Sequence, residues 1–280
     1  MRWIRLQKKN TTHDSEKKNG TLGKTFQILL FYLTIIVVWQ LVYIIFVDVL
    51  GVWKPYIMPS PLKIADKGAE LLTDLTFYAA IGSSMWRIIR GYVISVVIGT
   101  LIGTAMMRSK FLEMNLKPLI LGLQTLPSIC WVSFAILWFG LSQNAVIFVI
   151  VIGSAFSIAM SVNNSFKNIN PLYIKAAKTM GASGVTLYTK VMMPAALPMI
   201  ISGLRQGWSF AWRALMSSEM IISMVGLGQR LDTARSIRAD INEIVVIMIV
   251  IIILGVLVDT CIFSTIEKKM YSKRGLIKNG

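Results

Sequence analysis

Polar side chains recur at helical spacing inside two long apolar stretches of this sequence. One set is Ser202, Gln206, Ser209, Arg213 and Ser217, and the other is Ser154, Ser157, Ser161 and Asn164. Steps of three and four residues place each set on one face of a helix. Hydroxyl, amide and guanidinium groups in lipid cost free energy unless they turn toward other helices or water. We therefore expect both faces to line a pathway for a polar solute.

Arg213 is the sharpest member of these sets, because a charge well inside a span costs about 2.5–3.5 kcal/mol on insertion scales. A cation facing a cavity would suit an anionic solute. Alternatively, Arg213 pairs with Glu219 of a second copy or extends outward to the membrane surface. The two residues are six positions apart, about 240° around one helix, so they cannot pair within it. The predicted pathway residues are Ser154, Ser157, Ser161, Gln206, Ser209, Arg213 and Glu219.

Other residue types that could carry chemistry point to no site. Cys130 and Cys261 lie in apolar runs typical of packing residues. His13 lies in a polar tail without other metal-ligand residues, so no metal site is predicted. Gly20–Thr25 (GTLGKT) lacks the glycine spacing of a phosphate-binding loop. No ATP site is therefore expected on this chain.

The elements that must position the polar faces are membrane helices. Apolar residues make up 55% of the 280 residues and charged residues only 15%, which is too hydrophobic for a soluble domain. Since a span needs roughly 20 apolar residues, we predict an all-α polytopic membrane protein with six transmembrane helices. The predicted spans are 26–47, 91–107 (extended back toward 86), 118–139, 145–162, 197–222 and 244–266.

Lysine and arginine residues predict the orientation of these spans. With the N-terminus inside, the inner segments hold 19 of the 29 and the outer segments hold 6. Both termini are therefore predicted to be cytoplasmic. Residues 1–25 and 267–280 form basic tails around one domain, 26–266, and 1–25 does not look like a removable signal peptide. The net charge of +16 fits contact with anionic lipid headgroups, not with nucleic acid.

Two further segments predict local structure. After the first span, Ser60 can cap a surface helix and Pro61 can begin it. Its apolar stripe would comprise Leu62, Ala65, Ala69, Leu72 and Leu75. In the second span, Ser95, Gly99 and Gly103 are spaced by four and allow close helix approach, within the chain or between subunits.

The largest inner loop, 171–198, predicts a helix, a glycine turn and a second helix. Pro171 can begin the first helix, and Gly181 can adopt a positive φ after it. The second helix would end at Pro194 and Pro198. Small residues beside the turn, Ala176 and Ala177, would let another protein approach closely.

This loop resembles that of permease subunits of binding-protein-dependent ABC importers. The family pattern is Glu-Ala-Ala, three residues, Gly, nine residues and Ile-x-Leu-Pro. The matching positions here are Lys175, Ala176, Ala177, Gly181, Val191 and Pro194. Further similarity, to the sulfonate, taurine and nitrate branch, lies at Met58–Pro61, Trp86–Tyr92, Leu123–Gly140, Ser217–Ile221 and Gly226–Gly228. Two positions depart from the pattern: Lys175 replaces glutamate, and Ser133 replaces a proline, so that a kink there would depend on Pro127.

The resemblance implies a type I ABC importer permease fold in a prokaryotic cell membrane. It implies two permease copies, two cytoplasmic ABC ATPase subunits that hold ATP and Mg²⁺, and an extracytoplasmic solute-binding protein. The chain would then be no enzyme and carry no cofactor, and the loop 171–198 would couple it to the ATPase. A pyrimidine or thiamine precursor is an alternative solute. An ion-coupled secondary transporter is a further alternative, although the spans hold only Glu219 and Asp259 as acids and no convincing inverted repeat.

Overall fold

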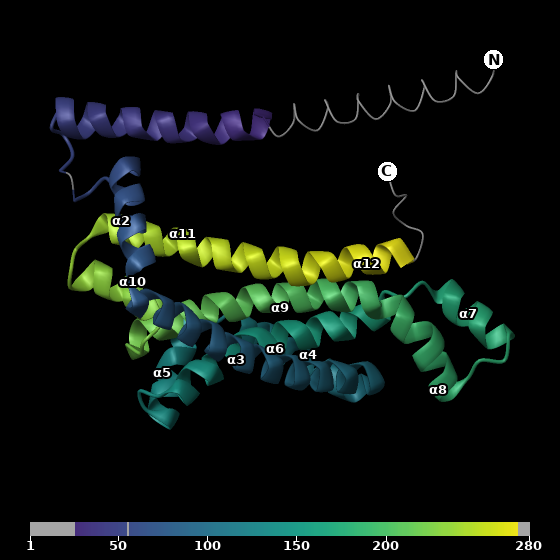
Figure 1. Ribbon diagram of the computed structural model, residues 1–280. Helices are drawn as coiled ribbons and strands as arrows, with labels where there is room; N and C mark the ends of the chain where they lie inside the picture. Colours follow the sequence, from purple (N-terminus) through teal and green to yellow (C-terminus); the bar gives the residue numbers. More distant parts are fainter. Residues whose placement is uncertain (1–25, 55, 274–280) are drawn as a thin grey trace, which may run out of the picture.

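The computed structural model describes residues 26–54 and 56–273, and these residues form helices without any strand (Figure 1). The predicted tail 1–25 and the end of the other tail, 274–280, lie outside the described residues. The helices are the first helix Phe26–Val49 (ending in η1, Ile44–Val49), α2 Pro61–Thr73, α3 Leu75–Arg108, α4 Lys110–Gln124, α5 Ser128–Phe139, α6 Gln143–Lys167, α7 Pro171–Thr179, α8 Gly184–Leu187, η2 Tyr188–Met192, α9 Met193–Ile222, α10 Leu227–Ser236, α11 Ile241–Val258, η3 Asp259–Ser264 and α12 Thr265–Lys273.

Five of the continuous helices are long and apolar enough to cross a membrane, and a bent pair brings the number to six. This agrees with the six predicted spans. The span predicted over 118–139 is broken at Pro127, where a kink was expected: α4 and α5 meet there at 98°, and α4 begins earlier than predicted, at Lys110. Pro127 has an extended ψ of 144° and lacks an N–H group, so the helix cannot continue through it. The second span is also longer than predicted and begins at Leu75.

The centre of the bundle is α6, which packs between α3 and α9. Side chains added to two glycines of α3 would collide with the α6 backbone: a Cβ on Gly99 would lie 2.7 Å from the Ala155 oxygen, and one on Gly103 would lie 2.5 Å from the Ala159 oxygen. Apolar surface alone gives little driving force between helices in lipid, so such close approach stabilises the pair. The small residues of α3 therefore pack within the chain.

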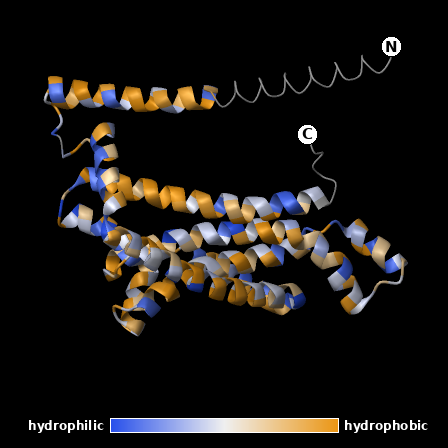
Figure 2. Cartoon of the chain, in the orientation of Figure 1, coloured by the Kyte–Doolittle hydropathy of each residue, from blue (hydrophilic) through white to orange (hydrophobic). Residues whose placement is uncertain are grey.

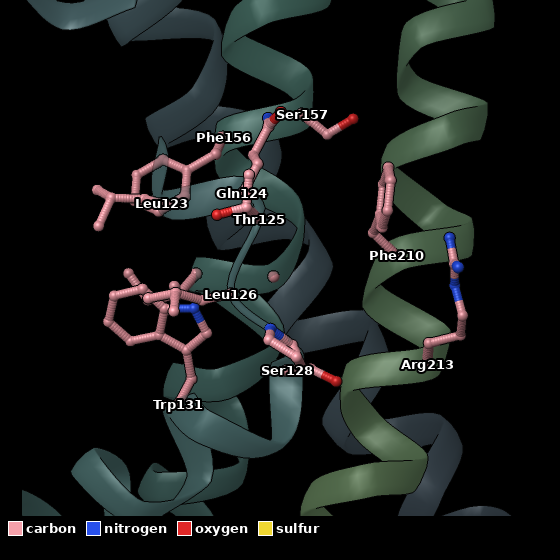
Figure 3. Close-up of a pocket in the computed structure, with 13 residues that line it drawn as sticks. Leu123, Gln124, Thr125, Leu126, Ser128, Trp131, Phe156, Ser157, Phe210 and Arg213 are labelled. Atoms are coloured by element: carbon pink, nitrogen blue, oxygen red, sulfur yellow. The ribbon is translucent and has the colours of Figure 1, made fainter. Parts of the chain in front are cut away.

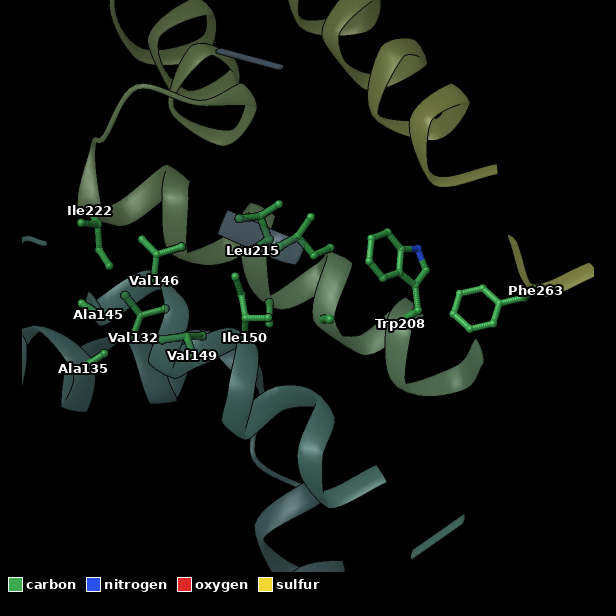
Figure 4. Close-up of a cluster of buried hydrophobic side chains, with 13 residues drawn as sticks. Val132, Ala135, Ala145, Val146, Val149, Ile150, Trp208, Leu215, Ile222 and Phe263 are labelled. Atoms are coloured by element: carbon green, nitrogen blue, oxygen red, sulfur yellow. The ribbon is translucent and has the colours of Figure 1, made fainter. Parts of the chain in front are cut away.

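A cluster of buried aliphatic and aromatic side chains joins α5, α6 and α9 (Figure 4). Val132, Ile150 and Leu215 are fully enclosed in it. Farther along α9, Trp208 packs against Phe263 of η3, with ring centroids 6.4 Å apart. This contact connects the last span to the central helices.

The first helix runs apart from the rest of the bundle (Figure 1) and is mostly apolar (Figure 2). Only Tyr43 and Val47 near its end are buried. Its remaining apolar surface suits lipid or another membrane-embedded partner.

The surface helix after the first span is confirmed as α2, but its predicted apolar face was wrong. Ile64 and Leu71 are buried against α11 and its neighbours, whereas Leu62 and Leu72 are exposed. Ser60 occupies the N-cap position, yet its hydroxyl donates to Gln40 of the first helix at 3.3 Å and not to α2. Packing onto α11 therefore decides which side of α2 faces inward.

Candidate functional site

The inner loop forms a helical hairpin of α7 and α8. The Asn170 side chain caps α7 by accepting from the Leu172 N–H at 2.9 Å, and Pro171 begins the helix. After α7, Gly181 has φ +84°, and Gly184, where α8 begins, has φ +53°. A Cβ on Gly181 would meet nothing within 4 Å. Glycine is therefore required there by the backbone conformation and not by crowding.

Pro194 and Pro198 were predicted to end the second helix of the hairpin, but this prediction was wrong. Residues Gly184–Ile222 form one continuous helix, and Pro194 stands in the first turn of α9. The π-helical turn η2 precedes it, in which the Met193 N–H donates to the Tyr188 oxygen, five residues back. This wider turn accommodates a residue without an N–H group. In Figure 1, α8 runs at an angle to the rest of α9.

The two alanines of the predicted coupling motif have different environments. Ala177 is buried, and its carbonyl accepts from the Ala182 N–H of the turn at 2.9 Å, whereas Lys175 and Ala176 are exposed. Val191 is half-buried and Pro194 is exposed. Ala177 therefore supports the hairpin, and Ala176 is available to a partner.

Large apolar side chains stand exposed around the hairpin. We call Leu172, Tyr173, Met180 and Val185 the hairpin patch; their side chains are 59–80% exposed. Stacking of Phe166 on Tyr188, with centroids 5.5 Å apart, attaches the hairpin to α6. A contiguous apolar patch on a segment that links spans is typical of a protein-binding surface.

The polar set in the fifth span does occupy one exposed face. Ser202, Gln206, Ser209 and Arg213 are all exposed along α9. The Arg213 guanidinium lies over the Phe210 ring at 4.6 Å, and its Nε donates to the Ser209 carbonyl at 3.2 Å. Arg213 has no carboxylate partner within the described residues. The α9 face is therefore a polar, positively charged surface.

The polar set on α6 is divided. Ser154 is buried and donates to the Ser95 hydroxyl at 2.7 Å and to the Ile150 carbonyl at 2.8 Å. Ser161 packs on α9, where a Cβ on Gly203 would lie 2.2 Å from the Ser161 Cβ. A cavity lies between α6 and α9, and Arg213 lines it; of the polar set on α6, only Ser157 also lines it (Figure 3). The cavity has a volume of about 390 Å³ and opens at the break between α4 and α5.

Glu219 does not belong to the exposed face, which corrects its placement among the pathway residues. It is fully buried, and its carboxylate accepts from Arg87 Nη1 at 2.6 Å, from the Ser84 hydroxyl at 2.7 Å and from the Gly228 N–H at 3.1 Å. It therefore cannot pair with Arg213 of a second copy. A Cβ on Gly226 would lie 2.4 Å from the Glu219 carboxylate, so the Gly226–Gly228 loop can enclose it only as glycine.

A second ion network joins α10 to the N-terminal ends of α3 and α11. Arg230 contacts Asp74 at 2.6 Å and Glu243 at 3.2 Å, and Arg238 contacts Glu243 at 2.8 Å. Hydrogen bonds from Thr76 and Arg230 lower the pKa of the Asp74 carboxyl to about 2. This network was not predicted from the sequence, because Asp74 and Arg230 are 156 residues apart. The charged residues of 230–243 were the local signal for it.

Fold and hairpin together define a polytopic membrane protein with a helical hairpin between two spans. A family model described as the binding-protein-dependent transport system inner membrane component matches residues 95–270, and the chain belongs to this family. The chain is therefore a permease subunit and not an enzyme, and its transport system includes a solute-binding protein and a separate ATPase.

Curated relatives and a solved structure agree with this assignment. A putative aliphatic sulfonates transport permease of Bacillus subtilis is 27% identical over 88% of this chain and 87% of its own length. The taurine transport system permease of Escherichia coli is 28% identical over 65% of this chain and 68% of its own. An inward-facing structure of the MetNI methionine ABC transporter matches with TM-score 0.60 and 18% identity over 70% of this chain and 96% of that chain.

Proposed function

We propose that this chain forms the translocation pathway of an importer for a small anionic solute of the sulfonate, taurine or nitrate type. The observation that carries the proposal is Arg213, a cation on an exposed polar face inside a span, to which residues 26–54 and 56–273 offer no carboxylate partner. Such a charge is costly in lipid but attracts an anion in a watery cavity. The names of the sulfonate and taurine permease relatives support the same solute class.

The α9 face also favours a second copy of the chain. Its polar residues are exposed in the part of the chain that the structure describes, and exposure to lipid would cost free energy. Two copies facing each other across α9 would enclose this face in a water-filled pathway. A separate part of the proposal is that both chain ends are cytoplasmic, as the distribution of lysine and arginine predicts.

The hairpin is proposed as the docking element for the ATPase. Lys175, Ala176 and the hairpin patch present an exposed surface, and Gly181 sets the direction of the turn. Because Gly184–Ile222 is one helix, a displacement of the hairpin is transmitted directly to Arg213. ATP and Mg²⁺ would act on the partner, and movement of α9 would open and close the pathway.

An ion-coupled secondary transporter is less well supported. Such a protein needs titratable carboxylates available near the middle of the membrane. Glu219 is enclosed with Arg87, and Asp259 accepts from Arg205 Nε at 2.5 Å. Neither acid is left free to bind and release a proton or cation.

Uptake by the reconstituted transporter tests the proposed solute class. Permease, ATPase and solute-binding protein would be placed in liposomes with ATP inside. Methanesulfonate, taurine and nitrate would be compared with a neutral pyrimidine at equal concentration. ATP-dependent uptake of at least one of the three, without uptake of the pyrimidine, is expected. Uptake of the pyrimidine alone would refute an anionic solute and favour the alternative.

A further inference from the structure

The break in the third span borders a cavity whose polar side chains are either neutral or positively charged. Its walls come from the α4–α5 break, from α6 and from α9 (Figure 3). A volume of about 390 Å³ lies in the usual range for small-molecule sites. Among the described residues, no aspartate or glutamate lines it, and Arg213 is the one charged side chain in its wall. The electrostatic character of the cavity therefore favours an anion.

Ser157 is a largely buried residue whose hydroxyl borders the cavity and has no acceptor in the described part of the chain. Its side chain is 7% exposed, and its hydroxyl makes no hydrogen bond there. Two other buried serines of the same helix, Ser154 and Ser165, donate to carbonyls one turn earlier at 2.8 and 2.6 Å. In Figure 3 the Ser157 hydroxyl points away from its own helix, into the space that faces α9. Ser157 is thus available to donate to a ligand in the cavity.

The N-terminus of α5 faces the same space. The helix begins at Ser128, after Pro127, and no side chain caps it. The first N–H groups of a helix have no partner within it, and the end carries a partial positive charge. Both Pro127 and Ser128 line the cavity. The first turn of this twelve-residue helix therefore borders the cavity that Ser157 and Arg213 also line, and the Ser128 N–H has no partner within the helix.

We propose that this cavity is a binding subsite for the oxyanion group of the transported solute, an inference that rests on the proposed function. Ser157 and the first turn of α5 would donate hydrogen bonds to the oxygens, and Arg213 would supply the opposite charge. The rings of Trp131, Phe156 and Phe210 would contact the apolar remainder of a sulfonate. Since the cavity lies between the two halves of a broken span, the solute would be held partway across the membrane.

Binding without the solute-binding protein tests this subsite. The permease–ATPase complex in lipid nanodiscs would be titrated with labelled methanesulfonate and, separately, nitrate. Saturable binding of at least one probe is expected. Ser157→Ala should weaken it about tenfold or more, since a hydrogen bond to a charged group is removed. Gln124→Glu, which adds a negative charge at nearly constant shape in the cavity wall, should abolish it.

Ser165→Ala is the matched control, because it removes a buried α6 hydroxyl that does not reach the cavity. The subsite is refuted if neither probe binds, or if Ser165→Ala weakens binding as much as Ser157→Ala does. Uptake by the complete transporter separates the two proposals. Anion uptake that Ser157→Ala and Gln124→Glu leave unchanged would refute the subsite alone, whereas absence of any anion uptake would refute the proposed function itself.

Discussion

The buried ion pair between Arg87 and Glu219 should contribute strongly to the stability of the contact between α3 and α9. Their side chains are 4% and 0% exposed, and Arg87 Nη1 lies 2.6 Å from the carboxylate. Arg87→Met would leave that carboxylate enclosed with only the Ser84 and Gly228 donors. Removing one member of a buried pair typically costs about 3–5 kcal/mol. At roughly 2–4 °C per kcal/mol for a large domain, the apparent Tm should fall by about 6–20 °C.

Thermal unfolding of the purified permease in nanodiscs measures this fall. Arg90→Met is the matched control, because Arg90 lies on the same helix but is exposed, with its guanidinium over Trp86 at 4.6 Å. The double variant Arg87→Met/Glu219→Gln should recover much of the loss, since no uncompensated charge remains buried. The reasoning fails if Arg87→Met lowers the apparent Tm no more than Arg90→Met, or if the double variant is less stable than Arg87→Met alone.

Three other changes give distinct expectations. Gly181→Ala should strain the hairpin by about 1–2 kcal/mol and reduce ATPase co-purification. Gly140→Ala, which places a similar strain at φ +64° in another loop, should leave ATPase co-purification unchanged, and equal retention of the ATPase by both variants would contradict the docking role. Lys175→Glu should weaken assembly with the ATPase of the same system, and unchanged assembly in a pull-down would show that this exposed residue makes no pairing contact. Asp74 has a folded pKa of about 2, below its ordinary value of 3.8, so its stabilising effect is complete above pH 4 and lost as the pH falls toward 2. Asp74→Asn should thus flatten the fall in apparent Tm between pH 5 and pH 2.5, and identical profiles would exclude the effect.

Helical spans were predictable from the sequence because bilayer thickness imposes a length on every apolar stretch. The positions where these helices break or bend were harder to predict from the sequence. Pro127 breaks its span, yet Pro194 and Pro198 lie inside a continuous helix. At Pro194, the preceding π-helical turn removes the conflict that proline normally creates. Nothing in the composition of 184–198 distinguishes these outcomes. The same applies to α2, whose buried side depends on where α11 lies.

The candidate site was also predictable only in part. The exposed face with Gln206, Ser209 and Arg213 followed from spacing along a single helix. The position of Ser154 could not follow in this way, because its burial depends on contact with Ser95, 59 residues away. Likewise, Glu219 pairs with a residue 132 positions away. Periodicity shows which side chains share a face, but tertiary contacts decide whether that face is open.

The charge of Arg213 is the feature on which the anion pathway depends most directly. Arg213→Gln keeps hydrogen-bonding capacity and much of the bulk, and Arg213→Lys keeps the charge but loses the planar guanidinium. The decisive measurement is anion uptake by reconstituted complexes, normalised to their ATPase rate. The pathway account predicts that the Gln variant assembles and hydrolyses ATP but transports far less anion per ATP, with the Lys variant between it and the unaltered protein. A Gln variant whose uptake and assembly fall in equal proportion, or whose uptake per ATP is unchanged, would contradict it.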